Sequence, residues 1–305
     1  MHLPSVVNSF GKAMRVKYGE KIHKISINAG MTCPNMDGTE GRGGCTFCNN
    51  ASFNQNIKNT PTIKQQISRG KHVVKKRTGA KKYIAYFQAY TNTYADVEYL
   101  KKLYNQALAD PNIIGLSIGT RPDCVPEPVL ALLADYQQQG YEVWLELGLQ
   151  SAFDKSLQRV NRGHDFAAYI DAISRAKKYQ LQVCTHLIIG LPGETMQQSL
   201  ISHQRVLEQG TQGLKLHPLH VVKGTQLSKQ WRNGDYQAIT FDDYINIATR
   251  IVINTPEDII FHRLTATAAK NILLAPQWCS QKWLVLNTIY QRLCSLKNNS
   301  LNLIT

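Results

Sequence analysis

The sequence has no run of about 18 apolar residues, which is the length that a membrane-spanning helix requires. Residues 1–19 carry basic side chains but no apolar stretch of the secretory kind, so we expect no export signal. The expected compartment is then the reducing cytosol, without contact with a membrane. The seven cysteines, an odd number, are accordingly expected as free thiols or ligands and not as a disulfide framework.

Acidic residues are missing from two long segments. Residues 41–95 contain ten Lys or Arg and residues 259–305 contain five, and neither segment contains Asp or Glu. The rest of the chain is close to neutral, so these segments account for the net charge of +14. Either the surface is basic without a specific role, or it binds an anionic macromolecule, of which nucleic acid is the simplest.

The chain alternates regularly between strand-like and helix-like segments. Short apolar runs, typical of buried strands, recur about every 30 residues with amphipathic patterns between them. The strands are expected at residues 22–29, 82–88, 112–119, 142–149, 182–189 and 213–219. The intervening helices are expected at residues 61–79, 96–109, 127–139, 165–179 and 195–209. Six such strands with helices between them predict an α/β fold with a parallel sheet, curled into a barrel or part of one.

This alternation stops at about residue 221. Residues 240–253 and 283–296 are expected to form helices, and residues 258–263 a strand. We therefore predict a barrel with an N-terminal arm over residues 1–220, and a C-terminal extension packed on it over residues 221–305.

Three cysteines stand together in the loop after the first strand. Two residues separate Cys45 from Cys48, and eleven residues rich in glycine separate Cys33 from Cys45. Three thiolates in one loop favour a metal ion or an iron–sulfur cluster. Zinc would need a fourth ligand, either His23 or a distant cysteine, and would stabilise a nucleic-acid-binding module without catalysis. A cubic [4Fe–4S] cluster on three thiolates would leave one iron open to a chelating ligand such as S-adenosylmethionine (SAM).

Longer motifs carry a resemblance that covers nearly the whole chain. They are CPNMDGTEGRGGCTFCNN, YFQAYTNTYA, IGTRPDC, LELGLQS, NRGH, GLPGET and LHPLHVVKGT. Together they resemble the YhcC-like radical SAM family, which is related to the elongator catalytic subunit and to coproporphyrinogen dehydrogenase. That family shares the long gap between the first two cysteines. The resemblance implies a partial (β/α)6 TIM-like barrel of the radical SAM type with a small C-terminal α/β extension.

The resemblance also implies how the cofactors are held. Cys33, Cys45 and Cys48 would ligate a single [4Fe–4S] cluster, and Phe47 would lie beside the adenine of SAM. Arg162, in NRGH, would pair with the SAM carboxylate, a group that suits the guanidinium fork.

Four further positions are implied as SAM contacts. Gln150, in GLQS, matches a glutamine that contacts ribose in relatives. Gln88 stands where relatives use a Gly-Gly-Glu-like segment, and His186 stands where the porphyrin-related branch has an acid that binds ribose. Leu191 lies in GLPGET, which is expected to form a SAM-binding turn after the fifth strand.

The implied reaction begins with an electron from a donor of the flavodoxin or ferredoxin type. The reduced cluster cleaves SAM to methionine and a 5′-deoxyadenosyl radical, which abstracts a hydrogen atom from the substrate. The elongator relationship and the two basic segments favour tRNA, with modification of the wobble uridine side chain. An alternative is a radical SAM enzyme that acts on a small metabolite or a protein, the basic surface being incidental.

The remaining cysteines and two histidines have open roles. Cys124 and Cys279 are candidates for a substrate-side thiol or hydrogen donor, the alternative being a small buried side chain. Cys184 is expected in the core. His217 and His220, near the end of the sixth strand, are either satisfied polar groups or substrate contacts.

Overall fold

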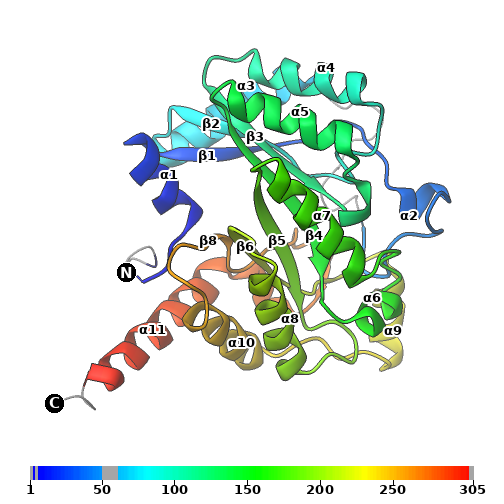
Figure 1. Cartoon of the computed structure of the whole chain (residues 1–305). Helices are drawn as coiled ribbons and strands as arrows, with labels where there is room; N and C mark the ends of the chain where they lie inside the picture. The colour runs from blue at the N-terminus through cyan, green and yellow to red at the C-terminus, as the bar shows by residue number, and fades with distance from the viewer. Residues whose placement is uncertain (1–2, 4–5, 50–60, 302–305) are drawn as a thin grey trace.

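The centre of the computed structural model is a curled sheet of seven parallel strands, in the order β1-β2-β3-β4-β5-β6-β8 (Figure 1). The strands are β1 (Ile22–Ile27), β2 (Lys82–Phe87), β3 (Ile113–Thr120), β4 (Glu142–Gln150), β5 (Gln182–Ile189), β6 (Gly213–Pro218) and β8 (Ile260–Arg263). The structure describes residue 3 and residues 6–49 and 61–301, without the side chains after residue 296. Parts of the two basic segments, residues 50–60 and 302–305, lie outside the described residues.

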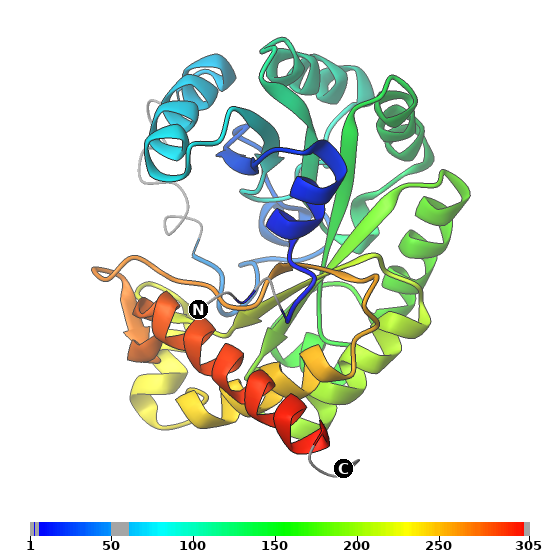
Figure 2. The ribbon, with the colours of Figure 1, turned by 90° about the vertical axis from the view of Figure 1, so that its left-hand side faces the viewer.

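Helices cover the outer face of the sheet and follow one another in an arc around it (Figure 2). They are α3 (Ile63–Thr78), α4 (Val97–Leu108), α5 (Glu127–Gln138), α7 (Phe166–Lys178), α8 (Met196–Glu208) and α10 (Phe241–Ile253). The last helix, α11 (Lys282–Leu301), packs on α10. Among the described helices, none has both the length and the apolar character needed to cross a membrane.

Short elements complete the chain at both ends of the sheet. The helices are α1 (Phe10–Tyr18), α2 (Pro34–Asp37), α6 (Asp154–Arg159) and α9 (Gln226–Asn233), with 3-10 turns η4 (Pro122–Cys124) and η5 (Gln277–Ser280). A separate antiparallel pair joins β7 (Val221–Val222) to β9 (Leu273–Ala275).

The two faces of the sheet differ because alternate residues of a strand point to opposite sides. On β2, Tyr83, Ala85 and Phe87 belong to the large apolar core, which includes the buried faces of α4 and α5. Ile84 belongs instead to a separate apolar cluster with Phe10 of α1. The outer core therefore holds the helices on the sheet, and the inner face is free to carry other chemistry.

Helix α1 closes the barrel at the amino ends of the strands. The ring of Phe10 lies 6.1 Å from that of Trp144 and 4.6 Å from that of His262. The Tyr18 hydroxyl donates a hydrogen bond of 2.6 Å to Glu142, the first residue of β4. The inside of the barrel is thus filled at this end, which leaves the carboxyl ends of the strands for a site.

The predicted α/β barrel fold is confirmed, and all six predicted strands are present within about two residues at each end. One difference concerns residues 258–263, which the pattern places in the extension. In the structure they contain β8, which pairs in parallel with β6 and adds a seventh strand. Helices α9 and α10 intervene between β6 and β8, and this longer connection hides the strand from the 30-residue repeat. The boundary at residue 220 stays a prediction.

A glycine on the sheet gives a testable measure of how tightly β3 and β4 pack. A Cβ atom at Gly115 would lie 2.0 Å from the backbone oxygen of Glu142, so Gly115→Ala must displace the strand. We expect it to lower the free energy of unfolding by about 1–3 kcal/mol. Gly11→Ala is the control, because a Cβ atom there meets nothing within 4 Å and alanine favours helix α1. Chemical unfolding should show that Gly115→Ala lowers the free energy of unfolding and that Gly11→Ala raises it. Equal changes in the two variants would contradict close packing at Gly115.

Candidate active site

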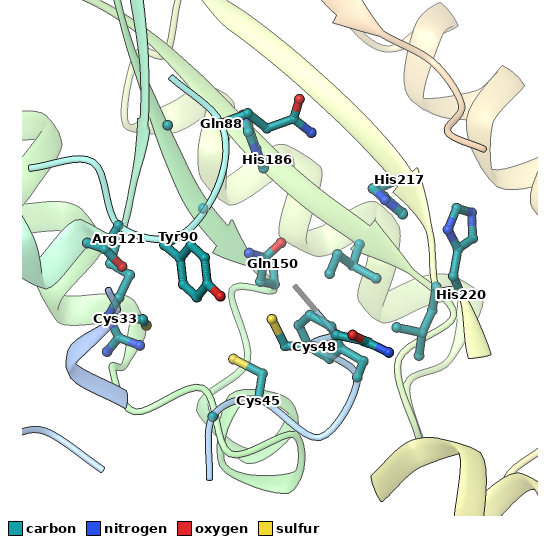
Figure 3. A pocket seen from close by; sticks show the side chains of 18 of the residues that line it. Cys33, Cys45, Cys48, Gln88, Tyr90, Arg121, Gln150, His186, His217 and His220 are labelled. Carbon is teal, nitrogen blue, oxygen red and sulfur yellow. The ribbon is translucent and has the colours of Figure 1, made fainter. Parts of the chain in front are cut away.

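A pocket of about 320 Å³ lies at the carboxyl ends of the strands (Figure 3). Six strands contribute to its lining: Tyr86 from β2, Gly119 from β3, Gln150 from β4, His186 from β5, His217 from β6 and Arg263 from β8. This is the place where parallel barrels carry their chemistry, because the loops that follow the strands converge there.

All three clustered cysteines line this pocket. Figure 3 shows them at one side, with Tyr90 and Gln150 above them in the view. Cys33 directly precedes α2, and Gly38 ends that short helix with a positive φ of 97°. The chain then returns through a glycine-rich turn, in which a Cβ atom on Gly41 would meet the Asn35 side-chain oxygen at 2.2 Å. This short helix and tight return explain how eleven intervening residues bring Cys33 and Cys45 to the same pocket.

Buried hydrogen bonds fix the cysteine loop against the segment after β4. The amide of Asn35 donates to the backbone oxygen of Asn161 at 2.6 Å, and its nitrogen lies 3.7 Å from Cys45 Sγ. The Cys48 backbone N–H donates to the Cys45 carbonyl at 2.9 Å, closing a turn between these two residues. The positions of the cysteines therefore depend on two segments that are far apart in the sequence.

Arg162 is a buried cation in contact with Cys45. Its side chain is 7% exposed and donates to the Gly148 carbonyl at 2.6 Å and to Cys45 Sγ at 3.6 Å. Its Nε is buried and has no hydrogen-bond partner among the described residues. Gly148 leaves room for this side chain, because a Cβ atom there would lie 3.0 Å from the Arg162 guanidinium and would shift it. A buried guanidinium with an unused donor is suited to an anionic ligand.

Two residues that line the pocket hold unusual backbone conformations. Tyr90 has a φ of 65° and Gln150 a φ of 81°, both in the left-handed region that residues with side chains seldom adopt. Such conformations persist only where the surrounding structure imposes them, and they concentrate at functional sites. Both side chains line the same pocket as the cysteines (Figure 3).

Most of the predicted site residues meet in this pocket. It is lined by Cys33, Cys45, Cys48, Phe47, Gln88, Gln150, Arg162 and His186. Phe47 also packs against an apolar cluster that contains Leu191, Leu219 and Val221. Leu191 does not line the pocket; its side chain is 2% exposed and belongs to that cluster, so it supports Phe47 from behind.

The two candidate substrate-side thiols lie elsewhere. Cys124 is buried at a separate surface depression with Asp123 and Pro126, and Cys279 is fully buried in η5. Burial raises the pKa of each thiol to about 12, and Asp123 adds to the effect at Cys124. The geometry gives neither thiol access to the pocket. Cys184 is fully buried in the apolar cluster that contains Phe10 of α1 and Trp144, as expected of a core residue.

Sequence reasoning missed a charged layer inside the barrel, just below the pocket. Glu146 of β4 is fully buried and accepts hydrogen bonds from Lys24 of β1 at 2.5 Å and from Lys215 of β6. His186 Nε2 lies 2.7 Å from the same carboxylate. Burial alone would raise the pKa of Glu146, but Lys215 and Lys24 outweigh it and hold that pKa well below its usual range. The carboxylate is therefore ionised at neutral pH.

This layer is not a metal site, although Glu146, Cys184 and His186 place possible ligand atoms within 4.8 Å of one another. Two lysine ammonium groups already bind the carboxylate, and a metal cation would meet their repulsion. The layer forms the charged floor of the pocket.

The family to which the chain belongs follows from comparison with known proteins. The radical SAM superfamily model matches residues 39–201, and the radical SAM C-terminal domain model matches residues 211–295. Protein YhcC of Escherichia coli K12 is 50% identical over 283 residues, which cover 93% of this chain and 91% of that protein. The chain therefore belongs to the radical SAM superfamily and, within it, to the YhcC-like family.

More distant matches agree with the fold. Elongator complex protein 3 of Schizosaccharomyces pombe is 30% identical over 151 residues, which cover 48% of this chain and 27% of that protein. The solved structure of the archaeal Methanocaldococcus infernus Elp3 has a TM-score of 0.63 at 17% identity and covers 89% of this chain and 63% of its own. This chain thus corresponds to only part of either elongator protein.

As a member of this superfamily the protein is a radical SAM enzyme, with a [4Fe–4S] cluster and SAM as cofactors, and it requires a reductant. This excludes the alternative of a zinc-stabilised module without catalysis. The pocket suits both cofactors: three thiols line one side of it, and the buried Arg162 beside them has a free donor. Among the described residues that line it, none is Asp or Glu, so no carboxylate competes with anionic ligands.

Proposed function

We propose that Cys33, Cys45 and Cys48 hold the cluster and that Arg162 binds the carboxylate of SAM. The observation that carries this is the meeting of the three thiols and one buried, incompletely satisfied guanidinium in a single pocket. Arg162 then has two tasks, to bind the carboxylate and to moderate the negative charge on Cys45. When bound, the cluster and SAM supply the reductive cleavage that yields a 5′-deoxyadenosyl radical for hydrogen abstraction.

Other side chains of the pocket would orient SAM and keep water away. Phe47, with the apolar cluster against which it packs, would offer a flat wall for the adenine, and Gln150 would hydrogen-bond the ribose. Gln88 would act as a polar contact at the end of β2, where its side-chain oxygen accepts from Ser26 at 3.2 Å. His186 already bonds Glu146, which fixes the ring at the floor. The cytosolic location and a donor of the flavodoxin or ferredoxin type stay predictions.

We further propose that the substrate is tRNA, modified on the wobble uridine side chain. Two observations support this: the similarity to elongator complex protein 3, and a basic face on α3. Lys71 of this helix pairs with Asp110 at 2.5 Å. The exposed basic residues of the helix are Lys64, Arg69, Lys75, Lys76 and Arg77. A row of exposed cations on one helix is what binding to a phosphate backbone requires.

Neutralising part of the α3 face should weaken tRNA binding in a salt-dependent way. For the double variant Lys75→Gln and Lys76→Gln, we expect about tenfold weaker binding and a slope of log affinity against log salt that is smaller by about 1–2. The control replaces Lys177 and Lys178, two exposed lysines at the end of α7, by glutamine. Filter binding at several salt concentrations measures both. Equal losses of tRNA affinity in the two double variants would contradict the proposal that tRNA binds specifically to the basic face of α3.

The substrate itself is tested by mass spectrometry of tRNA nucleosides from a deletion strain and its parent. We expect one modified uridine to disappear and its precursor to accumulate, with recovery on complementation by the wild type and not by Cys45→Ala. An unchanged nucleoside profile, with SAM cleavage intact in the purified protein, would reject tRNA and favour the alternative of a small metabolite or a protein.

A further inference from the structure

The side of the pocket away from Cys33 carries a second group of basic side chains. His217 and His220 stand there, at the end of β6, with ring centroids 4.6 Å apart (Figure 3). Arg263, the last residue of β8, lines the same pocket. The functions assigned above to the cysteines, Arg162, Phe47 and Gln150 use none of these three residues.

A bulge in β8 turns Arg263 into the barrel. Simple alternation along Ile260–Arg263 would place His262 inside and Arg263 outside. The register between β6 and β8 shifts by one residue, so that Arg263, and not His262, pairs with Lys215. Paired residues of neighbouring strands share a face, and Lys215 points inward to Glu146. Both His262 and Arg263 therefore reach the interior, which is a known consequence of an extra residue in a strand.

Two polar atoms at this end lack partners, whereas His217 Nδ1 lies 2.6 Å from the Pro218 carbonyl oxygen and bonds it. Arg263 Nε and His220 Nε2 are buried without a hydrogen bond in the described structure, and His220 is 8% exposed. Leaving buried polar atoms unpaired costs free energy, so such groups call for a ligand or an ordered water. Burial first, and then the charge of Arg263, lowers the pKa of His217 and brings that of His220 to about 4. The field at this end is thus positive even with neutral histidines.

The other cations around the pocket are already neutralised or committed. Arg121 pairs with Asp123 at 2.5 Å, and Lys24 and Lys215 pair with Glu146. Arg162 bonds Gly148 and lies beside Cys45. For Arg263, the structure of the described residues contains no ion pair. SAM carries one carboxylate, which Arg162 would bind, so the half-buried charge of Arg263 is available to a second anion.

We propose that Arg263, His217 and His220 form a subsite for one oxyanion group, a carboxylate or a phosphate, of the substrate that reacts with the SAM-derived radical. The subsite extends the proposed function, because it takes the cysteine side of the pocket as the cofactor side. Arg263 supplies the charge and a two-pronged donor. Each neutral histidine already donates its one N–H to a backbone carbonyl, His217 to Pro218 and His220 to Ala266, so it donates to the anion as the imidazolium that a bound anion favours. The subsite would fix the substrate at a set distance from the cofactor, on the side of the pocket away from Cys33.

The test measures anion binding apart from catalysis. Anaerobically reconstituted protein is titrated by calorimetry with inorganic phosphate and with acetate, in the presence of saturating SAM, and separately with SAM alone. We expect Arg263→Gln to weaken anion binding at least tenfold and to leave the affinity for SAM within about twofold. Arg263→Lys, which keeps the positive charge, should lose less anion affinity than Arg263→Gln. The tighter of the two probes tells whether the substrate group is a phosphate or a carboxylate.

Two controls separate this proposal from the proposed function. Arg250→Gln, on the exposed side of α10, makes the same charge change and should alter neither affinity. His220→Asn should weaken anion binding without changing the thermal midpoint or iron content, which guards against a folding defect in Arg263→Gln. The proposal is overturned if the wild type binds neither anion, if Arg263→Gln binds them normally, or if it loses SAM equally. Failure of the wild type to bind SAM, with anion binding intact, would overturn only the cofactor assignment.

Discussion

Cys45→Ala should be isolated almost without iron. Cys45 is the most buried of the three clustered cysteines, and both Asn35 and Arg162 direct donors at its sulfur. Loss of one of three thiolates removes a bond to the cluster and leaves those two donors without their acceptor. We expect iron to fall from about four atoms per chain to below about one, and SAM cleavage to be lost with it. Iron and sulfide analysis of anaerobically purified protein checks this.

Other cysteines provide the matched controls for this loss. The controls are Cys294→Ala and Cys124→Ala. Cys294 lies in α11, and Cys124 lies at the separate depression with Asp123. Both variants should keep the iron content of the wild type, since neither thiol lines the cysteine pocket. Retention of iron in Cys45→Ala, or its loss in Cys124→Ala, would contradict the assignment of the ligands.

Glu146→Gln should destabilise the protein more than any surface change. The variant removes the negative charge that two buried lysines share, and the cost of an uncompensated buried charge is about 3–5 kcal/mol. Glu208→Gln is the control, because Glu208 lies on the exposed side of α8; its free energy of unfolding should stay within about 0.5 kcal/mol of the wild-type value. Urea unfolding measures both free energies. A second substitution, Lys215→Met on top of Glu146→Gln, should recover part of the loss; no recovery would contradict the pairing.

The same carboxylate should make stability depend on pH. Because Lys215 and Lys24 hold its pKa well below the value in the unfolded chain, Glu146 stabilises the fold above the unfolded pKa of about 4.3. This contribution is lost as the pH falls through the lower, folded pKa. The difference in stability between wild type and Glu146→Gln should therefore be constant near neutral pH and shrink in acid. A difference that grows in acid would show that Glu146 is protonated in the folded state.

Local patterns predicted the fold well because each βα unit is self-contained. The strands from Ile22 to Pro218 are short apolar runs, and the helices between them have clear amphipathic faces. The seventh strand, β8, is only four residues long and pairs with β6 across two intervening helices. Its place in the sheet depends on tertiary packing, which no local pattern reports.

The site was only partly predictable for the same physical reason. The cysteines and Arg162 stand in motifs, so the sequence identifies them directly. Glu146 and Lys215 are single charges inside apolar strands, and their partnership depends on the curl of the sheet. Arg263 turns inward only because of the bulge in β8. Simple alternation along the strand would have placed its side chain outside the barrel. Leu191 stands in the motif expected to form a SAM-binding turn; its side chain packs in the adjoining core, and its contact with SAM stays a prediction.

The most direct test of the central claim is a Mössbauer spectrum of the anaerobically isolated, iron-57-enriched protein before and after addition of SAM. Three protein ligands to a four-iron cluster leave one iron without a thiolate, and SAM should bind that iron alone. We expect a [4Fe–4S] spectrum in which about one quarter of the iron changes its isomer shift when SAM is added. A protein without iron, or a spectrum in which SAM changes none of the iron, would contradict it.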